Sequence, residues 1–429
     1  MQGTGTAAEA RIATRNVAAE LAHGLFGQAG QRLVMAPTFL PALLFAASGS
    51  ELLVGLARAG QGLGAMLTPA IAAATVGHRR HVKRIALTAT FAGRLPLLAM
   101  ALAAALLPPL HAAWFCVLAL TAMGFANGFA QIALGQLRVR IVPAHRQGTV
   151  LGLRNTLGGL LAAALAALLG ATLFGTGALE DPQGLATAFS GVFGLAFLLG
   201  LTGLLALTFV AEPAAEETRP RRDTRQTIAD ARALLRRDAE FARFFTAYAM
   251  ANVARMGLPF YILYAAAELE AEGGLSGALL GTCTTLWLLA GTSTRLLWGR
   301  IGDRIGHDQV LAAGVAVWAG AQLLLLASAT PLALLCFFVL AGLGTGGFHT
   351  GANAFVLTRG PAAETAMRLA AVTTVTQAIA AVAPLLGGAL GAAFGFALVF
   401  GLSIAAQIAA LGLLLAGRPS LDSQKEYVP

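Results

Sequence analysis

Two arginines stand near the middle of long apolar stretches of the sequence, at positions 32 and 255. A guanidinium at the centre of a membrane helix costs about 2.5–3.5 kcal/mol of insertion free energy, so each one needs a compensating partner. None of the 20 Asp and Glu residues lies in the middle of such a stretch. An anion between two guanidiniums would remove their mutual repulsion and accept charge-assisted hydrogen bonds. Arg32 and Arg255 are therefore predicted to bind an anionic solute, with a purely structural role as the alternative.

Polar side chains at helical spacing accompany these arginines on four of the apolar stretches. Intervals of three, four or seven residues place such side chains on one face of a helix. The further candidate binding residues are Gln28, Gln31, Tyr248, Asn252, Asn127, Gln131, Thr345, His349 and Asn353, with Arg58 balanced between a binding and a structural role. Any one of them could simply join two helices within the membrane. Four such stripes together favour a polar cavity.

The composition indicates an all-α membrane protein. Hydrophobic residues make up 57% of the 429 residues and charged residues only 11%, whereas a soluble domain contains about 25% charged residues. Cys116, Cys283 and Cys336 lie far apart within apolar stretches, which gives neither a disulfide framework nor a metal-ligand spacing. The polar N-terminal segment does not have the pattern of a cleaved signal peptide. Most of the chain is thus expected to face lipid or neighbouring membrane helices.

Twelve stretches are long enough to span a bilayer, which takes about 20 residues. They are predicted at 17–47, 50–76, 83–108, 112–137, 147–174, 185–211, 241–266, 275–299, 309–329, 331–357, 365–392 and 394–416. The predicted organisation is a cytoplasmic N-terminus (1–16), a six-helix bundle (17–211), a cytoplasmic central loop (212–240), a second six-helix bundle (241–416) and a cytoplasmic tail (417–429).

The basic residues outside the spans all fall on one side of the predicted membrane, and the opposite loops contain neither Lys nor Arg. Under the positive-inside rule that side is the cytoplasm, so both termini are predicted to be cytoplasmic. Topology then accounts for the net charge of +9 without nucleic acid. Within the central loop, residues 230–245 predict an amphipathic helix on the membrane surface, and the part before Gln226 reads equally well as a solvated linker.

The two halves of the sequence resemble each other. GFANGFAQ at 124–131 corresponds to GLGTGGFH at 342–349, and Arg32 precedes Pro37 much as Arg255 precedes Pro259. Parallel repeats with a substrate site between them, near the bilayer midplane, are a transporter architecture.

The segment GRIGDRIGHD at 299–308 resembles the cytoplasmic loop signature of the major facilitator superfamily, with matches at Gly299, Asp303, Arg304 and Gly306. A first copy at 70–81 has Ala70 and Ala74 where the signature has glycine and aspartate. The resemblance implies a central cavity lined by the first, fourth, seventh and tenth helices, with Arg94 on a peripheral third helix. It also implies a cytoplasmic latch that stabilises the outward-open state. The expected gating residues are Gly299, Asp303, Arg304, Gly306 and Arg295, placed against the start of the fifth span.

The sequence therefore predicts a monomeric transporter of the plasma membrane, in a bacterium the inner membrane, that works by alternating access. Its predicted substrate is a small anion bound between Arg32 and Arg255, whose placement resembles that in the organophosphate:phosphate antiporters of the superfamily. Two alternatives are an exporter of an amphiphile or drug, with structural arginines, and a non-transporting assembly factor. An enzyme, a cofactor and a metal are not expected. Coupling is predicted to be exchange, facilitated flow, or proton movement on His349 or His23.

Overall fold

The computed structural model describes residues 3–76, 79–174, 181–213, 232–270, 274–328, 330–359 and 364–416. Within these ranges the chain is almost entirely α-helical and contains no strand. The first half consists of α1 (Gly3–Met35), α2 (Phe39–Ser48), α3 (Glu51–Val76), α4 (Lys83–Leu106), α5 (Pro109–Ile141), α6 (Gln147–Thr172) and α7 (Pro182–Thr208). The second half consists of α9 (Ala239–Val253), the short 3-10 helices η2 (Ala254–Met256) and η3 (Leu258–Phe260), α10 (Tyr261–Glu268), α11 (Gly277–Ile305), α12 (His307–Ala327), α13 (Pro331–Thr358), α14 (Thr365–Phe394) and α15 (Phe396–Ala416).

Eight of these helices are each long and apolar enough to cross a membrane: α4, α5, α6, α7, α12, α13, α14 and α15. The bent pair α1 and α2 makes a ninth such unit. The helices α3 and α11 are not among them; they carry the charged side chains of Arg58 and Arg295. The predicted all-α membrane class is therefore confirmed.

The helical stretches that carry the central arginines are both interrupted close to the arginine: α1 ends three residues after Arg32, and α9 ends two residues before Arg255. The predicted span 17–47 is in fact α1 and α2, which meet at an angle of 42° around Pro37. The predicted span 241–266 is divided into α9, η2, η3 and α10, with Pro259 inside η3. Proline lacks the N–H that continues a helix, which explains both interruptions.

The helix α1 begins at Gly3 and so extends through most of the predicted N-terminal segment 1–16.

The predicted central loop 212–240 and tail 417–429 fall largely outside the described residues. The continuous amphipathic helix predicted over 230–245 is wrong in its described part. The chain is helical over 232–237, and a new helix, α9, then starts at Ala239. Asp238 separates the two because its side chain accepts a hydrogen bond from the Phe241 N–H at 2.9 Å, which is the geometry of a helix N-cap.

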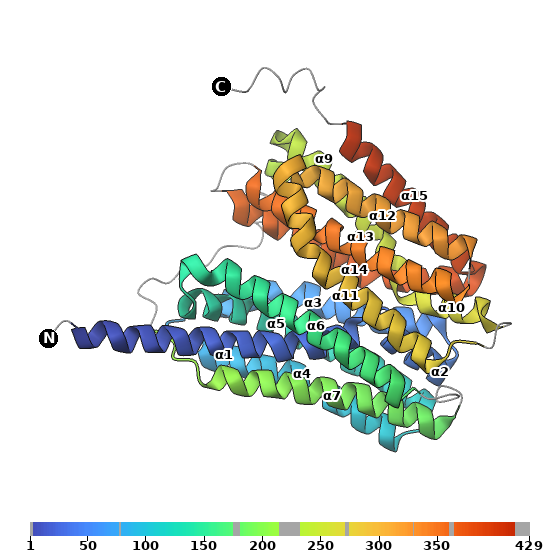
Figure 1. Ribbon diagram of the computed structural model, residues 1–429, viewed down its shortest axis with the longest axis horizontal. Helices are drawn as coiled ribbons and strands as arrows, with labels where there is room; N and C mark the ends of the chain where they lie inside the picture. Colours follow the sequence, from blue (N-terminus) through green and yellow to red (C-terminus); the bar gives the residue numbers. More distant parts are fainter. Residues whose placement is uncertain are drawn as a thin grey trace.

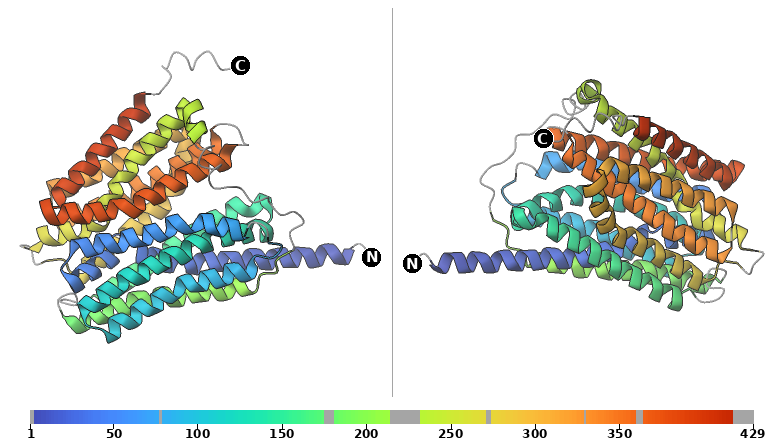
Figure 2. Two further views of the ribbon diagram at one scale, coloured as in Figure 1. Left: turned by 180° about the vertical axis from the view of Figure 1, so that it is seen from behind. Right: turned by 45° about the horizontal axis from the view of Figure 1, so that its top comes forward.

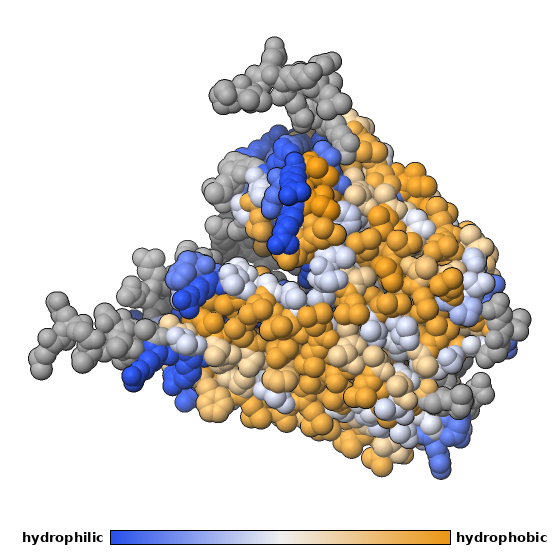
Figure 3. Space-filling model, in the orientation of Figure 1, coloured by the Kyte–Doolittle hydropathy of each residue, from blue (hydrophilic) through white to orange (hydrophobic). Residues whose placement is uncertain are grey.

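The two halves form two bundles that meet at one end and diverge at the other (Figures 1 and 2). They are joined mainly by packing of α3 on α14 and of α6 on α11. At the closed end, Gly170 of α6 and Gly281 of α11 approach so closely that a Cβ on either would lie 2.5 Å from the Cα of the other. The bundles separate toward the end that carries the N-terminus (Figure 2). Hydrophobic side chains cover most of the outer face, as expected for contact with lipid (Figure 3).

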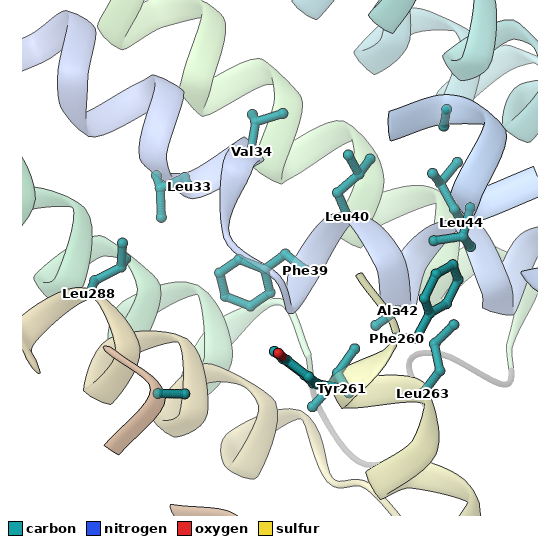
Figure 4. Close-up of a cluster of buried hydrophobic side chains, with 14 of the residues drawn as sticks. Leu33, Val34, Phe39, Leu40, Ala42, Leu44, Phe260, Tyr261, Leu263 and Leu288 are labelled. Carbon is teal, nitrogen blue, oxygen red and sulfur yellow. The ribbon is translucent and has the colours of Figure 1, made fainter. Parts of the chain in front are cut away.

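A continuous buried core crosses from one half to the other at the closed end (Figure 4). Leu33, Phe39 and Leu40 contribute from the first half, and Phe260 and Tyr261 from the second; all five are at most 1% exposed. Phe39 also stacks on Phe174 at the end of α6, with ring centroids 5.0 Å apart. Close packing of this kind, rather than exclusion of water, holds helices together in lipid. This core therefore seals one end of the space between the bundles.

Candidate substrate cavity

Two cavities lie between the bundles. The larger, of about 610 Å³, is lined by six of the predicted binding residues: Gln28, Gln31, Arg58, Asn127, Gln131 and Arg255. The smaller, of about 200 Å³, is lined by five of them, Arg32, Asn252, Arg255, Thr345 and His349, and by Arg295. Arg255 and Met35 line both cavities. Arg255 therefore lies where the two cavities meet.

The charge of these cavities is strongly positive. Five arginines line the larger one, namely Arg58, Arg94, Arg138, Arg154 and Arg255, and Arg32 and Arg295 join Arg255 in the smaller one. Among the lining residues there is no Asp or Glu. Glu20, which is 2% exposed, forms salt bridges with Arg154 and, at 2.6 Å, with Arg138. Two of the five arginines in the larger cavity are thus paired with a carboxylate.

Arg255 owes its position to the interruption of the helix that carries it. It lies in η2, between α9 and α10, and projects where the two cavities meet. In the part of the chain that the structure describes, its guanidinium has neither a hydrogen bond nor a salt bridge. All five N–H groups of its guanidinium are therefore available to a ligand.

Arg32 lies in the last turn of α1, on the opposite bundle. Its Nη1 donates a hydrogen bond to Thr292 Oγ1 of α11 at 2.7 Å, which links the two halves of the chain. The absence of a side chain at Gly159 makes room for it, since a Cβ there would lie 2.2 Å from Arg32 Nη1. Arg295, on the same helix as Thr292, lines the smaller cavity beside Arg32 and repels it.

Arg58 is occupied by the protein itself. Its Nη2 donates to the carbonyl oxygens of Val34, Met35 and Ala36 at 3.3, 3.3 and 3.0 Å. These are carbonyls at the end of α1, which have no partner within the helix because the chain breaks at Pro37. A cation at a helix C-terminus also interacts favourably with the helix dipole. Of the two roles predicted for Arg58, the contacts are those of the structural one.

The structure leaves two predicted binding residues outside both cavities. Tyr248 is 5% exposed and packs between Phe244 and Phe348, with ring centroids 5.8 and 5.0 Å away. Asn353 is exposed on α13. Both residues were predicted from helical spacing alone, and such a stripe continues beyond the length of a cavity. Tyr248 packs as a core aromatic residue instead.

The predicted latch residues lie at the end of α11. Gly306 ends this helix with φ +100, a conformation that favours glycine, and Gly299 lies one turn before Asp303. The Asp303 side chain is 75% exposed, its Oδ1 is 3.7 Å from His307 Nε2, and Arg304 is also exposed. The bundles are apart at this end, and within the described residues neither Asp303 nor Arg304 forms a hydrogen bond or salt bridge with α6. Arg295, predicted to belong with these residues, lies in the smaller cavity instead.

Several functional candidates escaped the sequence analysis. Arg138 and Arg154 had been explained by topology and Arg94 by a peripheral helix, yet all three line the larger cavity. A signal did exist for Arg138, because it continues the helical stripe of Asn127 and Gln131. For the other two, the sequence shows only that they are arginines close to apolar segments.

Glu212 places a carboxylate directly after the first copy of the loop signature at 70–81, at the start of α4. It accepts hydrogen bonds from the backbone N–H groups of Val82 and Lys83 at the start of α4, at 2.8 Å, and from Arg140 at 2.8 Å. An acidic group at a helix N-terminus is stabilising. Its location in the predicted central loop, far from 70–81 in sequence, concealed this role.

Comparison with known proteins identifies the family. The model of the major facilitator superfamily matches residues 24–270 and 257–427, and the chain belongs to this superfamily. It is a membrane transporter by family and fold, not an enzyme. None of the curated proteins compared with the sequence matches it.

Solved structures with the same fold include two transporters. The nucleoside transporter NupG is 14% identical, with a TM-score of 0.67 over 94% of this chain and 98% of NupG; a mutant of NupG gives a TM-score of 0.72 over 93% and 99%. A bacterial homolog of the human lysosomal transporter Spinster, in an inward-facing and unoccupied conformation, is 14% identical, with a TM-score of 0.66 over 94% of this chain and 95% of the homolog. At this identity the likeness concerns the fold.

Proposed function

We propose that the protein is an alternating-access transporter of a small anionic solute, with Arg255 as its principal anchor and Arg32 as a second one. The observation that carries the proposal is the charge of the cavities, whose lining includes seven arginines and lacks Asp and Glu. An unpaired guanidinium inside a membrane protein is costly, and a bound anion offsets that cost. Guanidinium groups also suit carboxylate and phosphate geometrically, because they form two parallel hydrogen bonds with them.

The placement of Arg32 and Arg255 supports a role in alternating access. The two side chains belong to different bundles and line the same small cavity. An anion held by both would draw the bundles together around it, because it replaces a repulsion by two attractions. Binding would thereby favour closure of the end at which the bundles now separate.

For the membrane topology we propose twelve spans with both termini in the cytoplasm. The bent pair α1–α2 and the interrupted unit α9–α10 each count as one span, and α3 and α11 complete the set. With the basic loops on the cytoplasmic side, the closed end faces outward and the present state is inward-open. A monomer in a bacterial inner membrane, exchanging one anion for another, is the simplest form of this proposal.

A second candidate is a transporter of an uncharged polar solute such as a nucleoside, since NupG is described as a nucleoside transporter. The amide groups of Gln28, Gln31, Asn127 and Gln131 line the larger cavity and could hydrogen-bond such a solute. On this reading the unpaired arginines remain without an explanation, which is why the anion is preferred.

A thermal-shift screen of the purified protein tests the proposal. Carboxylates and phosphate esters should raise the melting temperature in proportion to their affinity, whereas matched uncharged alcohols, nucleosides and organic cations should not. Stabilisation by uncharged solutes alone would favour the second candidate and refute the first.

A further inference from the structure

Arg94 lines the larger cavity from the first bundle and, like Arg255, has no ionic partner within the described residues. It is 7% exposed, its Nε is buried without a hydrogen-bond partner, and within the described ranges it has no salt bridge. It nevertheless lines the cavity from α4, together with His23 and Thr90. A buried cation in that situation is destabilising unless a counter-ion joins it.

The surroundings of Arg94 hold its side chain in place without neutralising it. Its aliphatic part packs against Gly200 of α7, where a Cβ would lie 2.6 Å from Arg94 Cδ. Its Nη2 lies 3.5 Å from the position of a Cβ on Gly27 of α1. The nearby carboxylate of Glu20 is already bonded to Arg138 and Arg154. The guanidinium is thus fixed at a wall of the cavity with unused donors.

The same cavity has its other unpartnered guanidinium at Arg255, on the opposite bundle. Arg94 lies at the level of Gly27 on α1. Arg255 lies at the level of Met35, because it repels Arg58, whose Nη1 donates to Met35 Sδ at 3.4 Å. Eight residues of helix separate these levels, so the two sites are about 12 Å apart along α1. This separation is too large for one carboxylate or phosphate group to bind both.

We infer that the larger cavity binds an elongated solute with two anionic groups, one held by Arg94 and the other by Arg255. The inference rests on the proposed function, since it keeps Arg255 as the anchor of one anionic group and adds a second subsite. Each anionic group is an oxyanion, a carboxylate or a phosphate, because these accept two parallel hydrogen bonds from a guanidinium. One bundle supplies each subsite, so the two ends of the solute would connect the bundles.

Calorimetric titration of the full-length protein with straight-chain α,ω-dicarboxylates of increasing length tests whether the cavity binds two anionic groups at once. Monocarboxylates of equal length are the reference, and the variants are Arg94→Gln, Arg94→Lys and Arg255→Gln. Arg84→Gln is the matched control because Arg84 is exposed on the same helix. For wild type and the control, a dicarboxylate of the spanning length should bind about tenfold or more tightly than its monocarboxylate, a hydrogen-bonded charge being worth that much.

Arg94→Gln should abolish this advantage while leaving monocarboxylate binding at Arg255 intact, and Arg94→Lys should restore part of the advantage. A length preference that survives in Arg94→Gln, or its absence from the wild type, overturns the inference. Titration with inorganic phosphate tests whether Arg94 binds a separate small anion instead. Binding of two phosphates by the wild type and of one by Arg94→Gln, together with no length preference among the dicarboxylates, would support a separate small anion and overturn the inference. If Arg255→Gln binds monocarboxylates as the wild type does, the proposed function itself fails, whatever Arg94 does.

Discussion

Arg32 of the first bundle donates a hydrogen bond to Thr292 of the second, 2.7 Å away and 260 residues along the chain. This contact occupies one donor of a guanidinium that we propose to bind substrate. An anion at Arg32 must therefore compete with, or add to, the hydroxyl of Thr292.

The variant Thr292→Val removes that competing acceptor. Because one net hydrogen bond contributes about 1 kcal/mol, the affinity for the anionic substrate should rise by about fivefold. Thr292→Ser keeps the hydroxyl and should behave like the wild type. Calorimetric titration of the three proteins with the best anion of the thermal-shift screen provides the measurement; weaker binding by Thr292→Val would show that the contact assists the site.

The stability of the protein should depend on Arg58 and not on Arg255. Arg58→Gln loses hydrogen bonds to three carbonyls at the end of α1, and we expect a loss of about 2–3 kcal/mol in unfolding free energy. Arg255→Gln removes an unpaired charge and should leave the melting temperature unchanged or higher. Thermal denaturation without ligand compares the two directly. A large loss of stability in Arg255→Gln would mean that this arginine is structural.

Much of the fold could be predicted from the sequence because an apolar stretch in lipid must satisfy its own backbone hydrogen bonds and therefore forms a helix. The interruptions of the helices near Arg32 and Arg255 could not be predicted, although the sequence shows Pro37 and Pro259. A proline inside a membrane helix is compatible with either a kink or a full break, and tertiary packing decides between them. The break at Pro37 also created the role of Arg58, because it exposed the carbonyls that this side chain now caps.

The cavity was predicted less completely than the fold. Helical spacing found Gln28, Gln31, Asn127 and Gln131, because the faces of straight helices follow from periodicity alone. Arg94 was missed, since its position depends on small residues of other helices, Gly27 and Gly200, that leave room for it. Contacts of this kind between distant segments leave no periodic trace in a single sequence.

Single cysteines placed in the loops test the predicted topology. In a background without Cys116, Cys283 and Cys336, cysteines within 77–84 and 219–225 should react with a membrane-impermeant maleimide only from the cytoplasmic side. Those within 178–183 and 268–273 should react from outside, because the basic loops stay in the cytoplasm. Labelling of either group from the opposite side would contradict the twelve-span arrangement and the inward-open assignment together.

The latch is expected to act in the conformation that this structure does not adopt. Asp303 is exposed here, with the bundles apart at its end of α11. In the outward-open state it should accept hydrogen bonds at the start of α6, and Asp303→Asn should shift the population toward the inward-open state. Spin-label distances between the cytoplasmic ends of α6 and α11 report the shift; an unchanged distribution would exclude this role.

Anion uptake by Arg255→Gln tests the central claim most directly. The protein is reconstituted into liposomes loaded with the best anion of the thermal-shift screen, and exchange with labelled external anion is followed. Arg84→Gln, which removes an exposed arginine outside both cavities and away from the latch, controls for the loss of one charge. The account predicts that Arg255→Gln folds with an unchanged or higher melting temperature and loses exchange by about tenfold or more, a hydrogen-bonded charge being worth that much, whereas the control still exchanges. Exchange by Arg255→Gln at the wild-type rate and affinity would contradict it.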